Sequence, residues 1–171
     1  MTVSARLTAA LTIFLAASSP YATTPMPREL EGIEGLWVRV MVSNGLPLDS
    51  VKLERELKAG IEERLRAAGL KSYSERTPAM ILVVSGRALG LVSCVKEEYY
   101  MVYLTLQVSE KVVIEREQRL VIPATTWDAG VRMMIAKRGE LTEEITITAE
   151  GIVEELFALI GTVERMRRLE Q

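Results

Sequence analysis

Apolar and polar positions along the chain follow two periods, one typical of strands and one typical of helices. Apolar residues occupy every second position over residues 36–42, which predicts a strand with one apolar face. Over residues 49–68 they recur every three or four positions, which predicts an amphipathic helix. Asp49 is placed to cap the start of this helix, and Gly69 followed by Leu70 is a typical helix end. The chain therefore opens its folded part with a strand and a helix.

Charged residues on the polar side of this helix have a spacing that favours ion pairs. Glu54 and Lys58 lie four residues apart, as do Glu62 and Arg66. Residues at this spacing are neighbours on a helix surface. We therefore expect both pairs to form.

Three more strands and a closing helix are predicted downstream. The second strand covers residues 79–89, and its apolar run predicts burial on both faces at the sheet centre. The third begins near Tyr99, and its end lies either at a turn near residues 109–111 or, as we favour, past Ile114 with a turn at 115–118. The fourth covers residues 119–126. The pattern does not decide the structure of residues 128–141. From Glu143 an apolar stripe predicts a helix.

The order strand, helix, strand, strand, strand, helix predicts an α+β fold. Two helices with one apolar stripe each suit a two-layer sandwich, in which they cover one face of a mixed sheet of about four strands. The first strand–helix–strand unit predicts parallel pairing, and the later strands predict antiparallel pairing. We assign residues 35–171 to this single domain.

The first 34 residues differ from the rest of the chain. Residues 7–17 form an apolar run of eleven without a charge, preceded by Arg6 and followed by small residues up to Ala22. This arrangement is typical of a secretory signal peptide and is too short to span a bilayer. We assign residues 1–22 to a signal peptide and 23–34 to a leader or linker, which predicts a periplasmic or secreted protein without a stable membrane span in its mature form. An uncleaved anchor is the alternative.

Composition narrows the possible chemistry. The chain has 21 Lys and Arg, 23 Asp and Glu, one Cys and no His. It therefore lacks the basic excess of a nucleic-acid-binding protein and the imidazole of Ser-His-Asp, Cys-His or His-based zinc sites. Cys94 has no intramolecular disulfide partner and is either a small buried residue or a reactive thiol.

Few residues suggest a catalytic site. Ser93 and Lys96 match the short pattern Ser-x-x-Lys, but its companion motifs are absent. The adjacent carboxylates Glu97-Glu98 and Glu143-Glu144 do not have the spacing of a metal site. We therefore assign no catalytic, cofactor-binding or metal-binding residue and expect no cofactor.

The segment Ala-Thr-Thr-Trp-Asp-Ala-Gly, residues 124–130, is the most distinctive in the chain. Trp127 could anchor a partner, because tryptophan is enriched at binding hot spots, or it could pack at the end of the core, which we favour. We take Trp127 and Asp128 as the candidate partner-binding residues.

The element order, the helix LERELKAGIEERLRAAGL, the run AMILVVSG, the strand YYMVYLTLQV, the segment ATTWDAG and the helix IVEELFALIGTV together resemble small exported bacterial envelope proteins. The pattern is similar to the TolB-type amino-terminal domain and to curli-secretion and lipopolysaccharide-assembly lipoproteins. The resemblance implies a non-catalytic periplasmic accessory or adaptor module that binds an envelope protein. A histidine-free hydrolase using carboxylates or Ser93, and a small-ligand-binding domain, are the alternatives.

Overall fold

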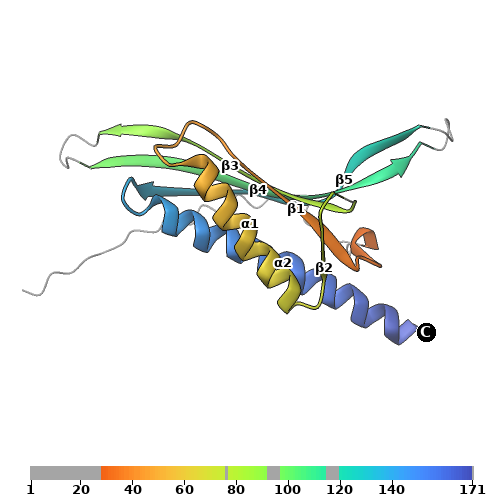
Figure 1. The fold of residues 1–171 in the computed structure, drawn as a ribbon. Helices are drawn as coiled ribbons and strands as arrows, with labels where there is room; N and C mark the ends of the chain where they lie inside the picture. Colours follow the sequence, from red (N-terminus) through yellow and green to blue (C-terminus); the bar gives the residue numbers. More distant parts are fainter. Residues whose placement is uncertain (1–27, 76, 92–96, 115–119, 171) are drawn as a thin grey trace, which may run out of the picture.

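The computed structural model describes residues 28–75, 77–91, 97–114 and 120–170. Five strands form one sheet, and two helices lie side by side under one of its faces (Figure 1). Along the chain the elements are η1 Arg28–Leu30, β1 Gly35–Val42, α1 Ser50–Ala67, β2 Lys71–Tyr73, β3 Ala79–Leu91, β4 Glu98–Val113, β5 Val121–Lys137 and α2 Leu141–Glu170. The α+β class and the placement of both helices on one face are as predicted.

The sheet has the order β2-β1-β3-β4-β5, so β3 is central. β1 runs parallel to β3, and β3, β4 and β5 pair antiparallel, as predicted. The count of four strands was too low, because β2 pairs with the start of β1. β2 is three residues of mostly polar sequence, too short to show a period.

The core lies between the sheet and the helices. Alternate residues of β1, β3 and β4 point toward the helices and are buried, among them Val38, Leu82 and Leu104. Helix α1 adds Leu53, Leu57, Ile61 and Leu65, and α2 adds the stripe Leu141, Ile145, Ala149, Ile152, Leu156 and Ile160. Among the described residues no polar or charged side chain is buried. The burial of these apolar side chains therefore holds the sheet and the two helices together.

Residues before β1 also belong to the core. Leu30, in η1, and Ile33 are both buried in the core cluster. Glu164 of α2 accepts a hydrogen bond from the backbone N–H of Gly32. Residues 28–34, which we assigned to a leader, are therefore part of the folded domain.

The ends of α1 are as the sequence predicts, but its ion pairs are not. The Asp49 carboxylate accepts a hydrogen bond from the N–H of Lys52, and the N–H of Leu70 donates to the carbonyl of Leu65. Gly69 has a φ of 79°, the left-handed conformation that such a helix end requires. The Glu54–Lys58 and Glu62–Arg66 pairs were wrong predictions. The pairs found are Lys52–Glu56 and Lys58–Glu62.

Two charged contacts explain how α1 is fixed to its neighbours. Glu54 points toward β1, where its carboxylate accepts a hydrogen bond of 2.8 Å from the N–H of Val42. Arg64 reaches α2 and pairs with Glu150 and Glu154. These hydrogen bonds raise the pKa of the Arg64 guanidinium above its ordinary value. The helix is therefore tied to the sheet at one end and to α2 at the other.

Candidate partner-binding surfaces

Trp127 and Asp128 lie in β5 between two β-bulges. Thr105 is opposite Val131 and Gln107 is opposite Asp128, so β5 has one residue more than β4 in this interval. A second extra residue, Thr126, lies between the pairs Val108–Trp127 and Ser109–Thr125. Each extra residue reverses the side to which the following side chains point. Odd-numbered residues in the regular parts of β5, such as Val131 and Met133, point away from the helices. Trp127 instead points toward the helices, because it lies between the two extra residues.

Side chains stabilise both bulges. The Asp128 carboxylate accepts hydrogen bonds from the N–H of Gly130, at 2.6 Å, and from the amide of Gln107, at 2.8 Å. Gly130 has a φ of 73°, which glycine adopts readily. At the other bulge, the Thr126 hydroxyl donates to the carbonyl of Val108. Asp128 thus has a structural role in β5, although its carboxylate remains exposed.

Trp127 is half-buried and packs against the hydrophobic core. This position agrees with the core role that we favoured from the sequence. Contact with a partner remains a prediction for both Trp127 and Asp128. Cys94, Ser93 and Lys96 lie outside the described residues.

The ends of β4 and β5 project from the body of the protein as a two-stranded hairpin (Figure 1). We call residues 110–114 and 120–124 the hairpin stem. β3 begins at Ala79, opposite Ser109, so beyond this point β4 has no second neighbour among the described strands. The N–H of Ile114 donates to the carbonyl of Leu120, which shows that β4 continues as we favoured. The expected turn at residues 115–118 lies outside the described residues.

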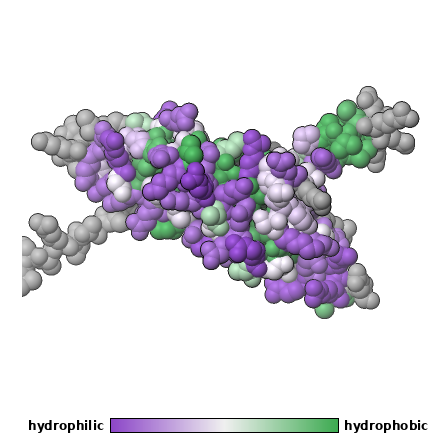
Figure 2. Space-filling view, in the orientation of Figure 1, coloured by the Kyte–Doolittle hydropathy of each residue, from purple (hydrophilic) through white to green (hydrophobic). Residues whose placement is uncertain are grey.

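Apolar side chains occupy both faces of the hairpin stem. Val113 and Val121 form a cross-strand pair on one face and are 56% and 51% exposed. Val112 and Ile122 form a pair on the other face. None of the stem residues belongs to the core cluster. Figure 2 shows a corresponding hydrophobic group at the projecting end of the molecule.

Glu110 lies at the base of the hairpin stem, on the side that continues the helix-facing positions of β4. Among the described residues, no basic side chain forms an ion pair with it. Partial burial raises the pKa of its carboxyl group above the ordinary value. The ionised form is therefore disfavoured in the folded protein.

We expect Glu110→Gln to increase the free energy of unfolding at neutral pH. Because the pKa of Glu110 is raised in the folded state, the protonated carboxyl group stabilises the fold in acid, and this stability is lost as the pH rises through the folded-state pKa. Glutamine resembles the protonated carboxyl group, so the gain in stability from Glu110→Gln should be present at neutral pH and vanish in acid. Urea unfolding of both proteins at neutral and acidic pH measures this. Glu63→Gln, at an exposed position of α1, is the control. An equal gain at both pH values would contradict the assignment.

The sheet face turned away from α1 and α2, which we call the outer face, has no second layer in the described structure (Figure 1). Val131, Met133 and Ile135 of β5 lie on it, and Val131 and Ile135 are 63% and 57% exposed. Ile81 and Val83 of β3 are half-buried there. The predicted burial of β3 on both faces was therefore wrong.

Other classes of site find no support in the described residues. Within residues 28–75, 77–91, 97–114 and 120–170, no three Cys, Asp or Glu side chains gather as metal ligands would. None of the helices in these ranges combines the length and the apolar character needed to cross a membrane.

No protein-family model and no curated protein matches the chain. Among solved structures, a minor lipoprotein from Acinetobacter baumannii is 16% identical, with a TM-score of 0.36 over 76% of this chain and 92% of that one. The rare lipoprotein B from Shewanella oneidensis is 12% identical, with a TM-score of 0.28 over 79% of this chain and 99% of that one. Both are bacterial lipoproteins, and the chain is similar to them at this low level. Similarity to the TolB-type domain stays a prediction.

Proposed function

We propose that this protein is a non-catalytic module of the bacterial cell envelope that binds another envelope protein through its hairpin stem. The observation that carries the proposal is the projecting stem with aliphatic side chains on both faces, outside the core. Full burial of one such side chain contributes about 1.5–3 kcal/mol, so a partner that covered both faces would gain substantially. The signal-like residues 1–22 support the envelope location.

The backbone of the stem supports pairing with a strand of the partner. Residues 110–113 of β4 lie beyond the start of β3 and have β5 as their only strand neighbour among the described elements. Their other edge offers N–H and C=O groups to an added strand. The opposite edge, in β5, is less suited, because Pro123 has no N–H and Thr126 forms a bulge. A partner strand would therefore continue the line of β3 along β4.

A photo-crosslinking residue at Leu120 tests this proposal in the native envelope. We expect one discrete protein adduct, because Leu120 is exposed in the stem. Val113→Asn with Val121→Asn should reduce the adduct more than tenfold, since two aliphatic side chains would no longer be buried in the interface. Val51→Asn is the matched control, because Val51 is an exposed aliphatic residue on α1. A crosslinker at Val51 should give no such adduct.

Two results would contradict the proposal. One is the absence of any protein adduct from Leu120. The other is an adduct that persists unchanged when both Val113 and Val121 are replaced, because binding would then not depend on the stem.

A further inference from the structure

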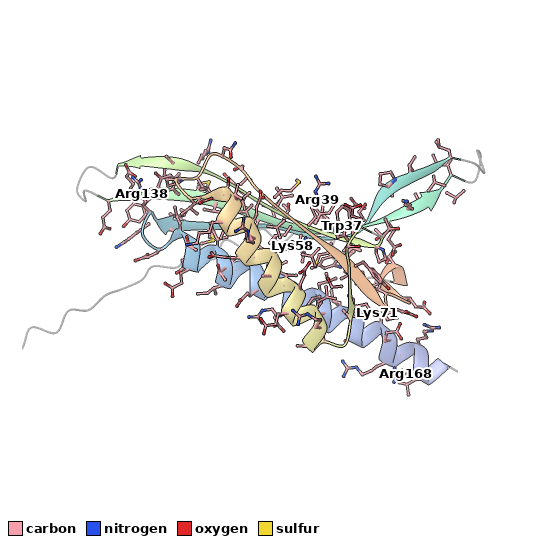
Figure 3. All side chains as sticks on the ribbon, viewed as in Figure 1. Trp37, Arg39, Lys58, Lys71, Arg138 and Arg168 are labelled. Carbon is pink, nitrogen blue, oxygen red and sulfur yellow. The ribbon has the colours of Figure 1, made fainter. Side chains whose placement is uncertain are left out.

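The outer face combines apolar and aromatic residues with an excess of basic side chains. Its aromatic residues are Trp37 in β1, with Tyr73, Tyr99 and Tyr103 at outward positions of β2 and β4. Met41, Val131, Met133 and Ile135 are its exposed aliphatic residues. Figure 3 shows Arg39 pointing away from the helices on this side. Aromatic and aliphatic side chains at one surface are typical of contact with the interface of a bilayer.

The charge of the outer face differs from that of the whole chain, which has slightly more acidic than basic residues. Among the described strand residues, pairing places five basic residues at outward positions and only one carboxylate, Asp128. The basic residues are Arg39, Lys71, Arg87, Lys111 and Lys137. By contrast, α1 and α2 on the opposite side together carry eleven Glu and eight Lys and Arg. The molecule therefore has a basic side and an acidic side.

Three of these basic residues are available for an external anion. Lys71 pairs with Glu34 and Lys137 pairs with Glu97. In contrast, Arg39, Arg87 and Lys111 are exposed, and no described carboxylate forms an ion pair with them. Asp128, the one outward carboxylate, is held by Gln107 and Gly130. The free charge on the outer face is thus mainly positive.

We propose that the outer face binds the surface of a bilayer that contains anionic phospholipid, with α1 and α2 turned away from the lipid. The apolar side chains would enter the interfacial region, and Arg39, Arg87 and Lys111 would contact lipid phosphates. The charge favours this occupant over a second copy of the chain, because two copies meeting through this face would bring like charges together. Of the residues named for this contact, only Lys111 lies in the hairpin stem, and the contact does not depend on a protein partner.

Trp37 provides a direct reporter. In the full chain with Trp127→Phe, Trp37 is the single tryptophan, because the sequence has only these two. Lipids brominated on their acyl chains quench tryptophan at short range. We expect quenching by vesicles of brominated phosphatidylcholine mixed with phosphatidylglycerol, and weaker quenching as salt is added. Residues 7–17 could bind lipid by themselves, but that would not bring Trp37 to the acyl chains.

Arg39→Gln with Arg87→Gln should weaken the apparent affinity roughly 10- to 30-fold, as expected for two basic residues near an anionic surface. Arg55→Gln with Arg66→Gln is the matched control, because both arginines are exposed on α1. It makes the same change of charge on the other side of the molecule and should have little effect. Val113→Asn with Val121→Asn should also leave Trp37 quenching intact, which separates this proposal from the function proposed for the stem.

Several outcomes would overturn the lipid assignment. These are an unquenched Trp37, equal quenching by vesicles of brominated phosphatidylcholine alone, and equal effects of the two arginine pairs. Sedimentation of the protein without lipid provides a further test. A stable dimer that is lost on Arg39→Gln with Arg87→Gln would assign the outer face to a second copy instead.

Discussion

Leu156→Asp should abolish the folded state. Leu156 is 0% exposed and lies in the apolar stripe of α2, against the sheet. Loss of a buried leucine side chain alone costs about 2–5 kcal/mol, and burial of an unpaired carboxylate costs several more. A domain of this size is stable by only about 5–15 kcal/mol. Circular dichroism of the purified variant should therefore show no cooperative thermal unfolding.

The matched control for this change is Ile147→Asp on the same helix. Ile147 is 56% exposed, so the new carboxylate would remain hydrated. Its melting temperature should stay within a few degrees of that of the unmodified chain. If Leu156→Asp also melted cooperatively near that temperature, the facing of α2 would be wrong.

Gly86→Ala should destabilise the protein by about 1–3 kcal/mol, because it overpacks a well-filled site. A Cβ at Gly86 would lie 2.8 Å from the carbonyl oxygen of Met101 and 2.5 Å from Cδ2 of Leu46. The first neighbour is backbone of the paired strand β4, which cannot move independently. The second belongs to the connection after β1, which passes close to β3 and donates a hydrogen bond from the N–H of Ser43 to the carbonyl of Val84.

Gly60→Ala is the control, with an expected effect of opposite sign. Apart from its own chain neighbours and the adjacent helix backbone, no described atom lies within 4 Å of a Cβ at Gly60, which is in the middle of α1. Alanine should therefore stabilise the helix by about 0.4–1 kcal/mol. Urea unfolding of both variants measures the two changes. Stabilisation by both would show that the connection after β1 does not pack closely on β3.

Local chemistry made α1 and its ends predictable from the sequence. Asp49 and Gly69 act on the backbone of their immediate neighbours at the two ends of the helix. Apolar residues spaced three or four positions apart lie on one face of a helix, so the sequence indicates the buried face directly. The Glu54–Lys58 pair failed because the Glu54 carboxylate accepts a hydrogen bond from the N–H of Val42, a contact between elements. Glu62 pairs with Lys58 instead of Arg66. A contact between elements depends on packing, which the periodicity of one helix does not show.

The surfaces proposed for binding were harder to predict. The apolar run of β3 indicates a buried strand but not how many layers cover it, and the structure leaves Ile81 and Val83 only half-buried. The stem projects because β3 begins opposite Ser109, which is a property of strand register. One signal was present in the sequence: Val131, Met133 and Ile135 alternate within the stretch whose structure we left undecided.

The two bulges of β5 compensate each other, because each shifts the alternation of inward and outward side chains by one residue. Thr126 and the extra residue near Gly130 each shift the phase of inward and outward positions, so only Trp127 and Asp128 are out of phase with the rest of β5. A related chain that lacked one of these residues would need its apolar positions exchanged on one side of the deletion. A chain that lacked both would need no exchange, because Trp127 and Asp128 would keep the facing that they have here. We therefore expect that, among related chains, insertions and deletions in this part of β5 occur in pairs.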